Sequence, residues 1–470
     1  MSNLTVFSVY LTSLAFQKSR VYPSMSGPES ANRARWWGLV VCGSCAIGGL
    51  IYRSLQRALH SAKAQKHRTR QRYPLVASHQ LVFEDVAYGP HPEQRLDLYV
   101  PRLQLGMGLE PRPSTSESVA VPLVVFIHGG LWCFGDKDEG YLIGRCLSLP
   151  PTLRNCGYGC VCGPTAAGGG EEDGGCCSPA LTSELGPCVV ASVNYRRSQM
   201  GTTGAESDSR IVHPSHTEDV TLALAWLASR LTSRHTCAEL GFGLLSVDID
   251  RVAFVGHSVG AHMAGLLCLS DSPSLSFWRA GDLDGDADAG VGAPGTWRLR
   301  VRGVVGVQGI YDTLQFCREK PEWAAIVRAA MPEDQRLWSS PQQCVPPPTR
   351  REQGQYLDQD GKGEGRLAWL LVHSLQDPWV ESLQSLSFCA ALRAAGFRAD
   401  VCLLPSGGSH DAALQLIGRR ERGGHGGELL DCRDLDQCEA IPPSQSCTTQ
   451  VLRFLASVLS PRAACDGAAH

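Results

Sequence analysis

The sequence predicts an α/β fold in which a mostly parallel central sheet carries helices on both faces. Short, nearly continuous apolar runs, typical of strands buried on both faces, alternate with longer segments whose apolar residues recur at helical spacing. The 470 residues are 43% hydrophobic and 19% charged, which is ordinary for a globular protein with a large core. This alternation and composition favour one large domain with insertions over two separate domains.

The predicted elements follow a basic N-terminal arm. Residues 81–101 have the pattern of two antiparallel strands joined by a turn at Gly89-Pro90. A helix is expected to begin near Pro214, and residues 322–341 have the pattern of a short helix and connector that form a cap. Further strands are expected within residues 121–127, 188–198, 251–269, 300–312, 367–380 and 400–418.

Four stretches rich in Gly, Cys or charged residues interrupt these elements. Their composition does not provide an apolar face to bury, so we expect flexible or disordered insertions. They lie near residues 155–187, 281–296, 345–366 and 419–447. The predicted organisation is therefore an arm over residues 1–80 and one α/β domain over residues 81–462.

The arm has the features of a membrane anchor. It holds eleven Lys and Arg residues against the single acid Glu29. Within it, residues 36–52 (WWGLVVCGSCAIGGLIY) are uncharged over 17 positions, near the lower limit for a spanning helix, with aromatic residues at both ends. The basic segment 53–72 follows, which by the positive-inside rule places the downstream domain in the cytosol, beside an anionic leaflet.

We therefore expect a single-pass protein of the endoplasmic reticulum or Golgi membrane. A mitochondrial transit peptide, or an arm that is cleaved or merely amphipathic, is the alternative. The twenty cysteines fall mostly in apolar runs or Gly-rich stretches, at spacings that do not match the usual zinc patterns, so we expect a reducing compartment and no metal site. No nucleic-acid partner is expected for a chain of net charge −3.

The motif that carries chemistry is a Gly-x-Ser-x-Gly turn at Gly256 to Gly260, between a strand-like and a helix-like run. This arrangement is called a nucleophile elbow, and it presents Ser258 at the end of a strand. A Cβ at either glycine is expected to clash with the tight turn. The pattern alone is common by chance, so the case depends on the residues that accompany it.

Upstream, a buried-strand run ends in His128-Gly129-Gly130. Backbone N–H groups in such a loop stabilise the oxyanion that forms during acyl transfer. The candidate donors are the amides of Gly129 and Gly130 together with that of Val259, which follows the nucleophile.

Downstream, Asp377 ends another apolar run and His410 follows a strand and a Gly-Gly turn. A serine hydroxyl becomes a good nucleophile when a histidine accepts its proton, and a carboxylate holds that imidazole in the correct tautomer. The chain order Ser258, Asp377, His410 is the order of the α/β-hydrolase fold. Right-handed crossovers bring these strand ends to one edge of the sheet.

Other interpretations of these positions remain open. Ser258 could be an accidental small residue in a strand-to-helix turn, and Asp377 could be a turn-starting residue before a proline. His425 and His470 also follow Asp377, but the first lies in a Gly-rich stretch and the second ends the chain, so His410 is the preferred base.

Nearby aromatic residues are assigned weaker roles. His128 and His373 end apolar strands and are expected to be structural, and His257 and His262 are expected to pack or form hydrogen bonds near the nucleophile. Trp132, just past the oxyanion loop, could line the substrate pocket, and ordinary core packing is at least as good an explanation.

Six sequence features together resemble the esterase and formamidase branch of the α/β-hydrolases: HGGLW, NYR, GHSVGAH, GIYD, WSSP and the spacing from Asp377 to His410. Two subfamilies are close. These are the isoprenylcysteine methylesterases, membrane enzymes that remove the methyl ester of prenylated cysteine, and the soluble kynurenine formamidases. RLDLYVP, FIHGGLWCFGDKDEGYLIGR and the N-terminal anchor look more like the methylesterases. The four insertions and the long gap between Arg196 and Pro214 depart from both subfamilies and leave the substrate open.

The resemblance implies a serine esterase with Ser258, Asp377 and His410 as the catalytic residues and no metal or organic cofactor. The expected substrate is a small-molecule or lipidated-peptide ester. A kynurenine formamidase-like amidohydrolase and a general carboxylesterase are the alternatives. A hypothesis of another class is a membrane-tethered binding protein that has lost its chemistry on a hydrolase scaffold.

Overall fold

The computed structural model describes twelve parts of the chain: residues 79–102, 119–151, 185–199, 210–232, 237, 245–270, 299–331, 339–347, 367–405, 409–417, 428–430 and 447–460. Nearly all of them belong to one compact unit made of residues 75–197 and 212–470. A second unit, residues 1–74 with 198–211, is described only at 198–199 and 210–211. The candidate anchor at 36–52 and the basic segment 53–72 lie outside the described residues. No helix in the described part of the chain has the length and apolar character that a membrane span requires.

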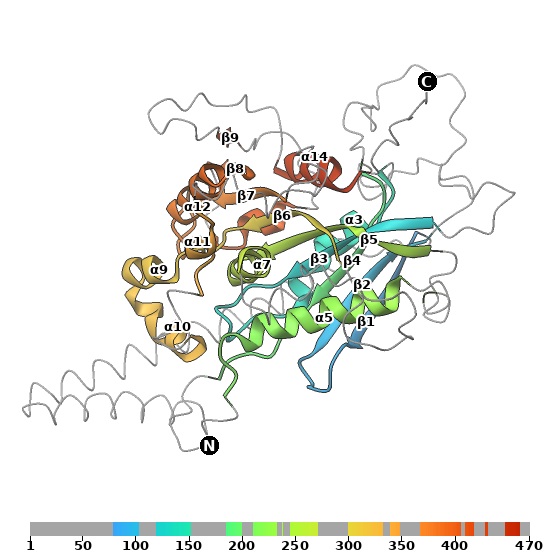
Figure 1. Cartoon of the computed structure of the whole chain (residues 1–470), viewed down its shortest axis with the longest axis horizontal. Coiled ribbons are helices and arrows are strands. Elements are labelled where there is room, and N and C mark those ends of the chain that lie inside the picture. The colour runs from blue at the N-terminus through green and yellow to red at the C-terminus, as the bar shows by residue number, and fades with distance from the viewer. Residues whose placement is uncertain are drawn as a thin grey trace, which may run out of the picture. The chain divides into compact units, whose positions relative to one another are not determined.

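The described residues form a nine-stranded sheet in the order β1-β2-β4-β3-β5-β6-β7-β8-β9 (Figure 1). The five pairings that link β4, β3, β5, β6, β7 and β8 are parallel, whereas β2 pairs antiparallel with β1 and β4, and β8 with β9. The strands are β1 Gln80–Ala87, β2 Arg95–Pro101, β3 Val119–Ile127, β4 Val189–Val193, β5 Leu245–His257, β6 Val301–Val307, β7 Ala368–Ser374, β8 Arg398–Leu404 and β9 Glu428–Leu430. The predicted α/β fold with a mostly parallel sheet is confirmed.

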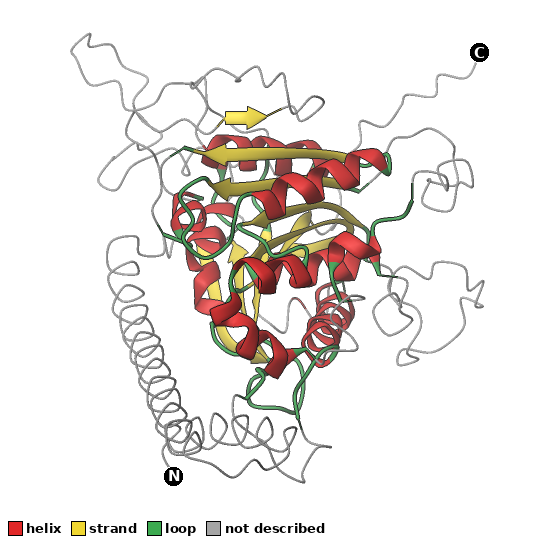
Figure 2. Ribbon diagram, turned by 90° about the vertical axis from the view of Figure 1, so that its left-hand side faces the viewer, coloured by secondary structure: helices red, strands yellow, loops and turns green. Residues whose placement is uncertain are grey.

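Helices lie on both sides of this sheet (Figure 2). The α-helices are α3 Tyr141–Leu147, α5 Ser215–Leu231, α7 Val259–Leu269, α9 Thr313–Glu319, α10 Ala324–Ala330, α11 Pro341–Cys344, α12 Leu383–Ala394, α13 Ala412–Leu416 and α14 Cys447–Leu459. Two short 3-10 helices, η1 Lys137–Gly140 and η4 Pro321–Trp323, precede α3 and α10.

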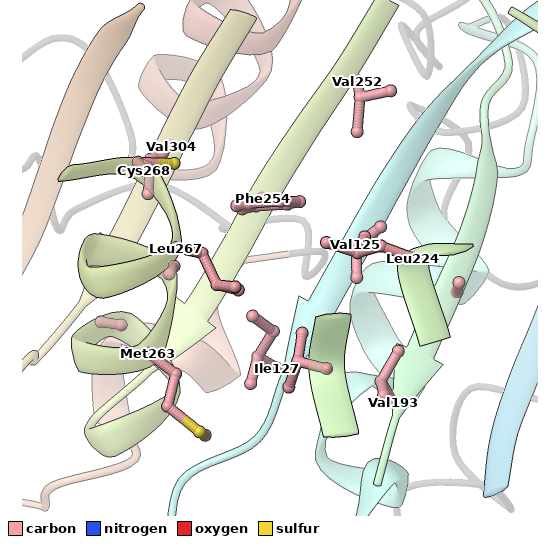
Figure 3. Packing of buried hydrophobic residues seen from close by; sticks show 14 of the residues in the cluster. Val125, Ile127, Val193, Leu224, Val252, Phe254, Met263, Leu267, Cys268 and Val304 are labelled. Carbon is pink, nitrogen blue, oxygen red and sulfur yellow. The ribbon is translucent and has the colours of Figure 1, made fainter. Parts of the chain in front are cut away.

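Alternate residues of the central strands build two cores. Val125 and Ile127 of β3 pack in one cluster with Leu224 of α5 and Leu267 of α7 (Figure 3). Successive strand residues point to opposite faces, so Phe126 faces the other side. There it lies under η1, close enough that a Cβ on Gly140 would be 2.6 Å from its ring.

Helix α14 covers this second side farther along the sheet. A Cβ on Gly303 of β6 would lie 2.8 Å from Cγ2 of Val458, whereas the adjacent Val304 belongs to the core on the side of α7. Both faces of the central strands are thus covered, which explains why these strands are apolar at nearly every position.

Most element predictions hold. The antiparallel pair within residues 81–101 is β1 with β2, and α5 begins directly after Pro214. Within the predicted insertion near 419–447, residues 428–430 form the short strand β9 against β8, and the rest of that stretch up to residue 446 lies outside the described residues. The amphipathic helix α14 was not predicted. The stretches near 155–187, 281–296 and 345–366 lie outside the described residues except at their edges, and the domain limits stay a prediction.

Candidate active site

The predicted elbow joins β5 to α7 through Ser258. This serine has φ 53° and ψ −117°, a left-handed conformation that non-glycine residues rarely adopt. A Cβ on Gly256 would lie 2.5 Å from the amide nitrogen of Ala261, and one on Gly260 would overlap the carbonyl oxygen of Ile127. The prediction that both flanking positions require glycine is therefore confirmed.

Asp377 and His410 are brought together from two strand ends. Asp377 follows β7, His410 lies between β8 and α13, and Nδ1 of His410 is 2.8 Å from Oδ2 of Asp377. The other carboxylate oxygen, Oδ1, accepts the amides of Trp379 at 2.9 Å and Val380 at 3.2 Å. Burial alone would raise the pKa of Asp377, but the hydrogen bond and charge of His410 and these two amides lower it to about 2. The carboxylate is thus ionised at neutral pH, and it leaves Nε2 as the imidazole nitrogen available for proton transfer.

The elbow touches the segment that carries His410. The ring of His257, which precedes Ser258, has its centroid 5.0 Å from that of His410, and its Nε2 lies 3.3 Å from the carbonyl oxygen of His410. Ser258 and His410 are both buried, at 4% and 6% exposure. The three predicted catalytic residues therefore belong to one sheet edge, whereas the competing His425 and His470 lie outside the described residues.

A further site residue, Gln308, was missed by the sequence reasoning. It follows β6, has φ 48°, and donates from Nε2 to Oδ2 of Asp377 at 2.8 Å. Its Oε1 accepts the amide of Ala413 at 3.3 Å. The signal in the sequence was a polar residue directly after a buried strand, β6. In the sheet, β6 lies between β5, which leads to Ser258, and β7, which leads to Asp377.

The loop at Gly129 and Gly130 lies against the elbow. A Cβ on Gly129 would be 3.1 Å from Cβ of Ser258, and Gly130 begins three consecutive residues with positive φ. The amide of Gly129, however, donates to Oε2 of Glu139 at 3.1 Å. Because this N–H is already bonded to a carboxylate, the arrangement does not fit the predicted role of Gly129 as an oxyanion donor. Gly130 and Val259 stay predicted donors.

Trp132 is fully buried and packs edge-on against His262, with ring centroids 5.0 Å apart. It belongs to the same apolar cluster as α5 and α7. This placement favours the core-packing alternative over a substrate contact.

The histidines expected to be structural have such surroundings. His128 is fully buried and stacks on Tyr195 at 4.3 Å. His373 is held between Ser385 and the carbonyl oxygen of Val380, and burial lowers its pKa to about 4, so it is neutral.

An exposed tryptophan, Trp379, adjoins His410. The ring of Trp379 is 5.1 Å from that of His410, and the ring of Trp323 in η4 is 5.8 Å from Trp379. Trp379 is 42% exposed, which is unusual for so large an apolar side chain. Lys320, just before η4, pairs with Glu381 at 2.8 Å and so links η4 to the segment after Asp377. The sequence reasoning did not single out either tryptophan.

Among the described residues, no group of three or more His, Cys, Asp or Glu side chains has a geometry that could hold a metal ion. Cys237 and Cys402 are buried free thiols.

Comparison with known proteins found distant relatives. No protein-family model matches the chain. The chain is 24% identical over 348 residues to the probable isoprenylcysteine alpha-carbonyl methylesterase ICMEL1 of Oryza sativa subsp. japonica, covering 73% of this chain and 60% of the relative. It is 23% identical over 339 residues to the protein of the same description from Arabidopsis thaliana, covering 71% of this chain and 52% of the relative.

The chain thus spans less than two thirds of the length of these relatives. Among solved structures, it is similar to esterase B from Lactobacillus rhamnosis, with a TM-score of 0.45 and 16% identity, covering 79% of this chain and 90% of the other. The predicted resemblance to isoprenylcysteine methylesterases is confirmed as distant sequence similarity, and the fold is an α/β fold with a mostly parallel sheet.

Proposed function

We propose that this chain is a serine hydrolase of carboxylic esters that uses Ser258, His410 and Asp377. The observation that carries the proposal is the 2.8 Å bond between Asp377 and His410 at the sheet edge where Ser258 has the strained elbow conformation. A fixed carboxylate–imidazole pair beside a serine held in a left-handed turn is the arrangement that nucleophilic acyl transfer requires.

In the proposed reaction, His410 accepts the hydroxyl proton of Ser258 as the serine oxygen attacks the ester carbonyl carbon. The bond to the leaving alcohol then breaks, and the alcohol takes the proton from His410. A water molecule attacks the acyl-enzyme by the same route and releases the acid and free Ser258. Asp377 keeps its negative charge throughout and stabilises the imidazolium. The amides of Gly130 and Val259 are the proposed oxyanion donors, and the chemistry requires no cofactor.

For the substrate, we propose an ester with a large apolar portion, and specifically the methyl ester of a prenylated cysteine. The distant similarity to methylesterases and the exposed ring of Trp379, which lies beside the partly buried Trp323, support this choice. An N-formyl aromatic amide and a simple aryl ester are the competing substrates. Trp132, which the sequence suggested as a pocket residue, is buried in the core and is not part of this proposal.

A fluorophosphonate probe tests the chemistry. The wild-type chain is expected to be labelled, Ser258→Ala is expected not to be, and Ser229→Ala on α5 serves as the matched control that keeps the label. Absence of Ser258-dependent labelling in folded protein would favour the non-catalytic binding protein. Turnover of a prenylcysteine methyl ester, N-formylkynurenine and an aryl ester then tests the substrate. Equal turnover of all three would leave a general esterase.

We also propose that residues 36–52 anchor the chain in the endoplasmic reticulum or Golgi membrane with the hydrolase domain in the cytosol. The uncharged stretch and the basic segment after it support this. Ile47→Arg, at a cost of about 2.5–3.5 kcal/mol for a charge near the centre of a span, is expected to move the chain into the soluble fraction after cell lysis. Import into mitochondria in place of this behaviour would favour the transit-peptide alternative.

A further inference from the structure

His257, the residue before Ser258, is buried with each ring nitrogen facing an oxygen that only accepts hydrogen bonds. Nδ1 lies 3.1 Å from Oε2 of Glu139, and Nε2 lies 3.3 Å from the carbonyl oxygen of His410. A neutral imidazole carries one N–H and can donate only one of these bonds, whereas an imidazolium donates both. The arrangement of acceptors therefore favours the charged form of His257.

The charged groups around this ring favour the same form. Glu139 faces it from η1, and Oδ1 of Asp411 lies 3.8 Å from Nε2. From the same segment as Asp411, the titratable ring of His410 also lies beside the ring of His257. His128, directly after β3, is kept neutral by burial, which lowers its pKa.

Electrostatics agree with the geometry. Burial alone would lower the pKa of His257, but the hydrogen bond and negative charge of Glu139 raise it to about 9. Burial likewise would raise the pKa of Glu139, and the bond and charge of His257 lower it to about 2. Both side chains are therefore ionised at neutral pH.

The pair links three segments of the proposed active site. Oε2 of Glu139 accepts the amide of Gly129 as well as the bond from His257. A Cβ on Gly129 would lie 2.9 Å from Nδ1 of His257, so the glycine loop, the elbow and the carboxylate are in close contact. Through its other nitrogen, His257 holds the backbone of His410.

We propose that Glu139 and His257 form a charged positioning pair, in which the imidazolium holds the carbonyl of His410 and the carboxylate holds the loop at Gly129. The inference rests on the proposed esterase function, and neither residue is assigned a contact with substrate. Deprotonation of His257 removes one of its two donated bonds. Activity is therefore expected to fall on the basic side as His257 loses its proton.

The pH profile of kcat/KM for p-nitrophenyl butyrate, measured on the full chain, tests the pair. The wild-type profile is expected to fall near pH 9, where His257 titrates. Glu139→Gln removes the charge that stabilises the imidazolium, so the fall is expected to move down by about one pH unit or more. At pH 8, kcat is expected to fall about 10- to 100-fold with KM nearly unchanged, because misplacement of reacting groups acts on the chemical step.

Asp400→Asn is the matched control, since Asp400 forms an ion pair with Arg393 at 2.9 Å between β8 and α12. It is expected to leave the profile unchanged. If kcat/KM declines at the same basic pH in wild type and in Glu139→Gln, the proposal is overturned, whether or not the substitution also changes the rate.

A second measurement does not depend on turnover. Histidine side-chain resonances followed by NMR in the full chain are expected to include one that titrates near pH 9 and is missing in His257→Gln. If no histidine titrates above pH 8, the charged pair does not exist. Loss of Ser258-dependent labelling, by contrast, would refute the proposed function and leave this titration intact, so the two failures are distinguishable.

Discussion

Nε2 of Gln308 lies 2.8 Å from Oδ2 of Asp377, the same carboxylate oxygen that is 2.8 Å from Nδ1 of His410. The two amides after Asp377 bind its other oxygen, so four donors fix this carboxylate. A carboxylate held in this way stays ionised and keeps one orientation. The imidazole of His410 is therefore presented in a single tautomer toward the reacting groups.

Asp377→Asn is expected to leave the fold intact and to lower kcat by about 10³- to 10⁴-fold, because an amide can stabilise the wrong imidazole tautomer. An ester hydrolysis assay measures the rate, and circular dichroism checks the fold. A loss of less than about 10-fold would contradict the assigned role.

Gln308→Ala is expected to lower kcat more than it changes KM, by about 10-fold, because one donor to Asp377 and one acceptor for Ala413 are lost. The substitution leaves the amide of Ala413 without its acceptor and Oδ2 of Asp377 with one donor fewer. This loss is expected to reduce the free energy of unfolding by about 1–3 kcal/mol. Steady-state kinetics and urea unfolding measure the two effects. An unchanged kcat in Gln308→Ala would show that the other three donors suffice.

Trp379→Ala is expected to lower kcat/KM for long-chain esters by about 10-fold while acetate esters change little, because the exposed indole next to His410 offers apolar surface to the substrate. Kinetics over a series of acyl chain lengths, and over a series of leaving groups, measures the effect. Leu375→Ala removes an apolar side chain that is also exposed, at 53%, and serves as the control. The same dependence on chain length in wild type and Trp379→Ala would exclude this contact.

Gly256→Ala is expected to prevent folding or to destabilise the chain by more than about 4 kcal/mol, because its Cβ would meet backbone atoms of α7 that cannot move independently. Thermal unfolding of the purified protein measures the change. Gly186→Ala is the matched control, since a Cβ there has nothing within 4 Å. Similar stability of the two variants would contradict the tight turn at the elbow.

Acid is expected to weaken the fold through Asp377. Its pKa is about 2 in the folded chain against an ordinary value of 3.8. A lowered folded-state pKa contributes stability that is present above pH 3.8 and is lost as the pH falls toward 2. Urea unfolding between pH 2 and 5 is expected to show a shallower pH dependence in Asp377→Asn than in wild type. Parallel curves for the two proteins would indicate that other groups cause the acid sensitivity.

The sequence predicted the alternation of strands and helices, the antiparallel pair at the start of the domain, and the elbow with its two required glycines. These features are local: apolar periodicity and glycine at fixed spacing are visible in short windows. It also nominated Asp377 and His410, because both follow apolar runs whose ends a parallel sheet brings to one edge.

Contacts between distant segments were not predictable in the same way. Gln308 and Trp379 acquire their importance only from being next to Asp377 and His410, and β9 forms only because β8 offers an open edge. The bond between Gly129 and Glu139, which conflicts with the expected oxyanion role, likewise depends on how η1 packs below β3.

The sequence by itself determined the fold class and the type of chemistry to look for, because backbone conformation and burial pattern are encoded within a few neighbouring residues. The tertiary structure decided which groups hold Asp377, which amide is already occupied, and which nitrogen of His257 meets which oxygen. Those choices depend on distances of a few ångströms between residues that lie from 10 to 153 positions apart, and no local pattern specifies such distances.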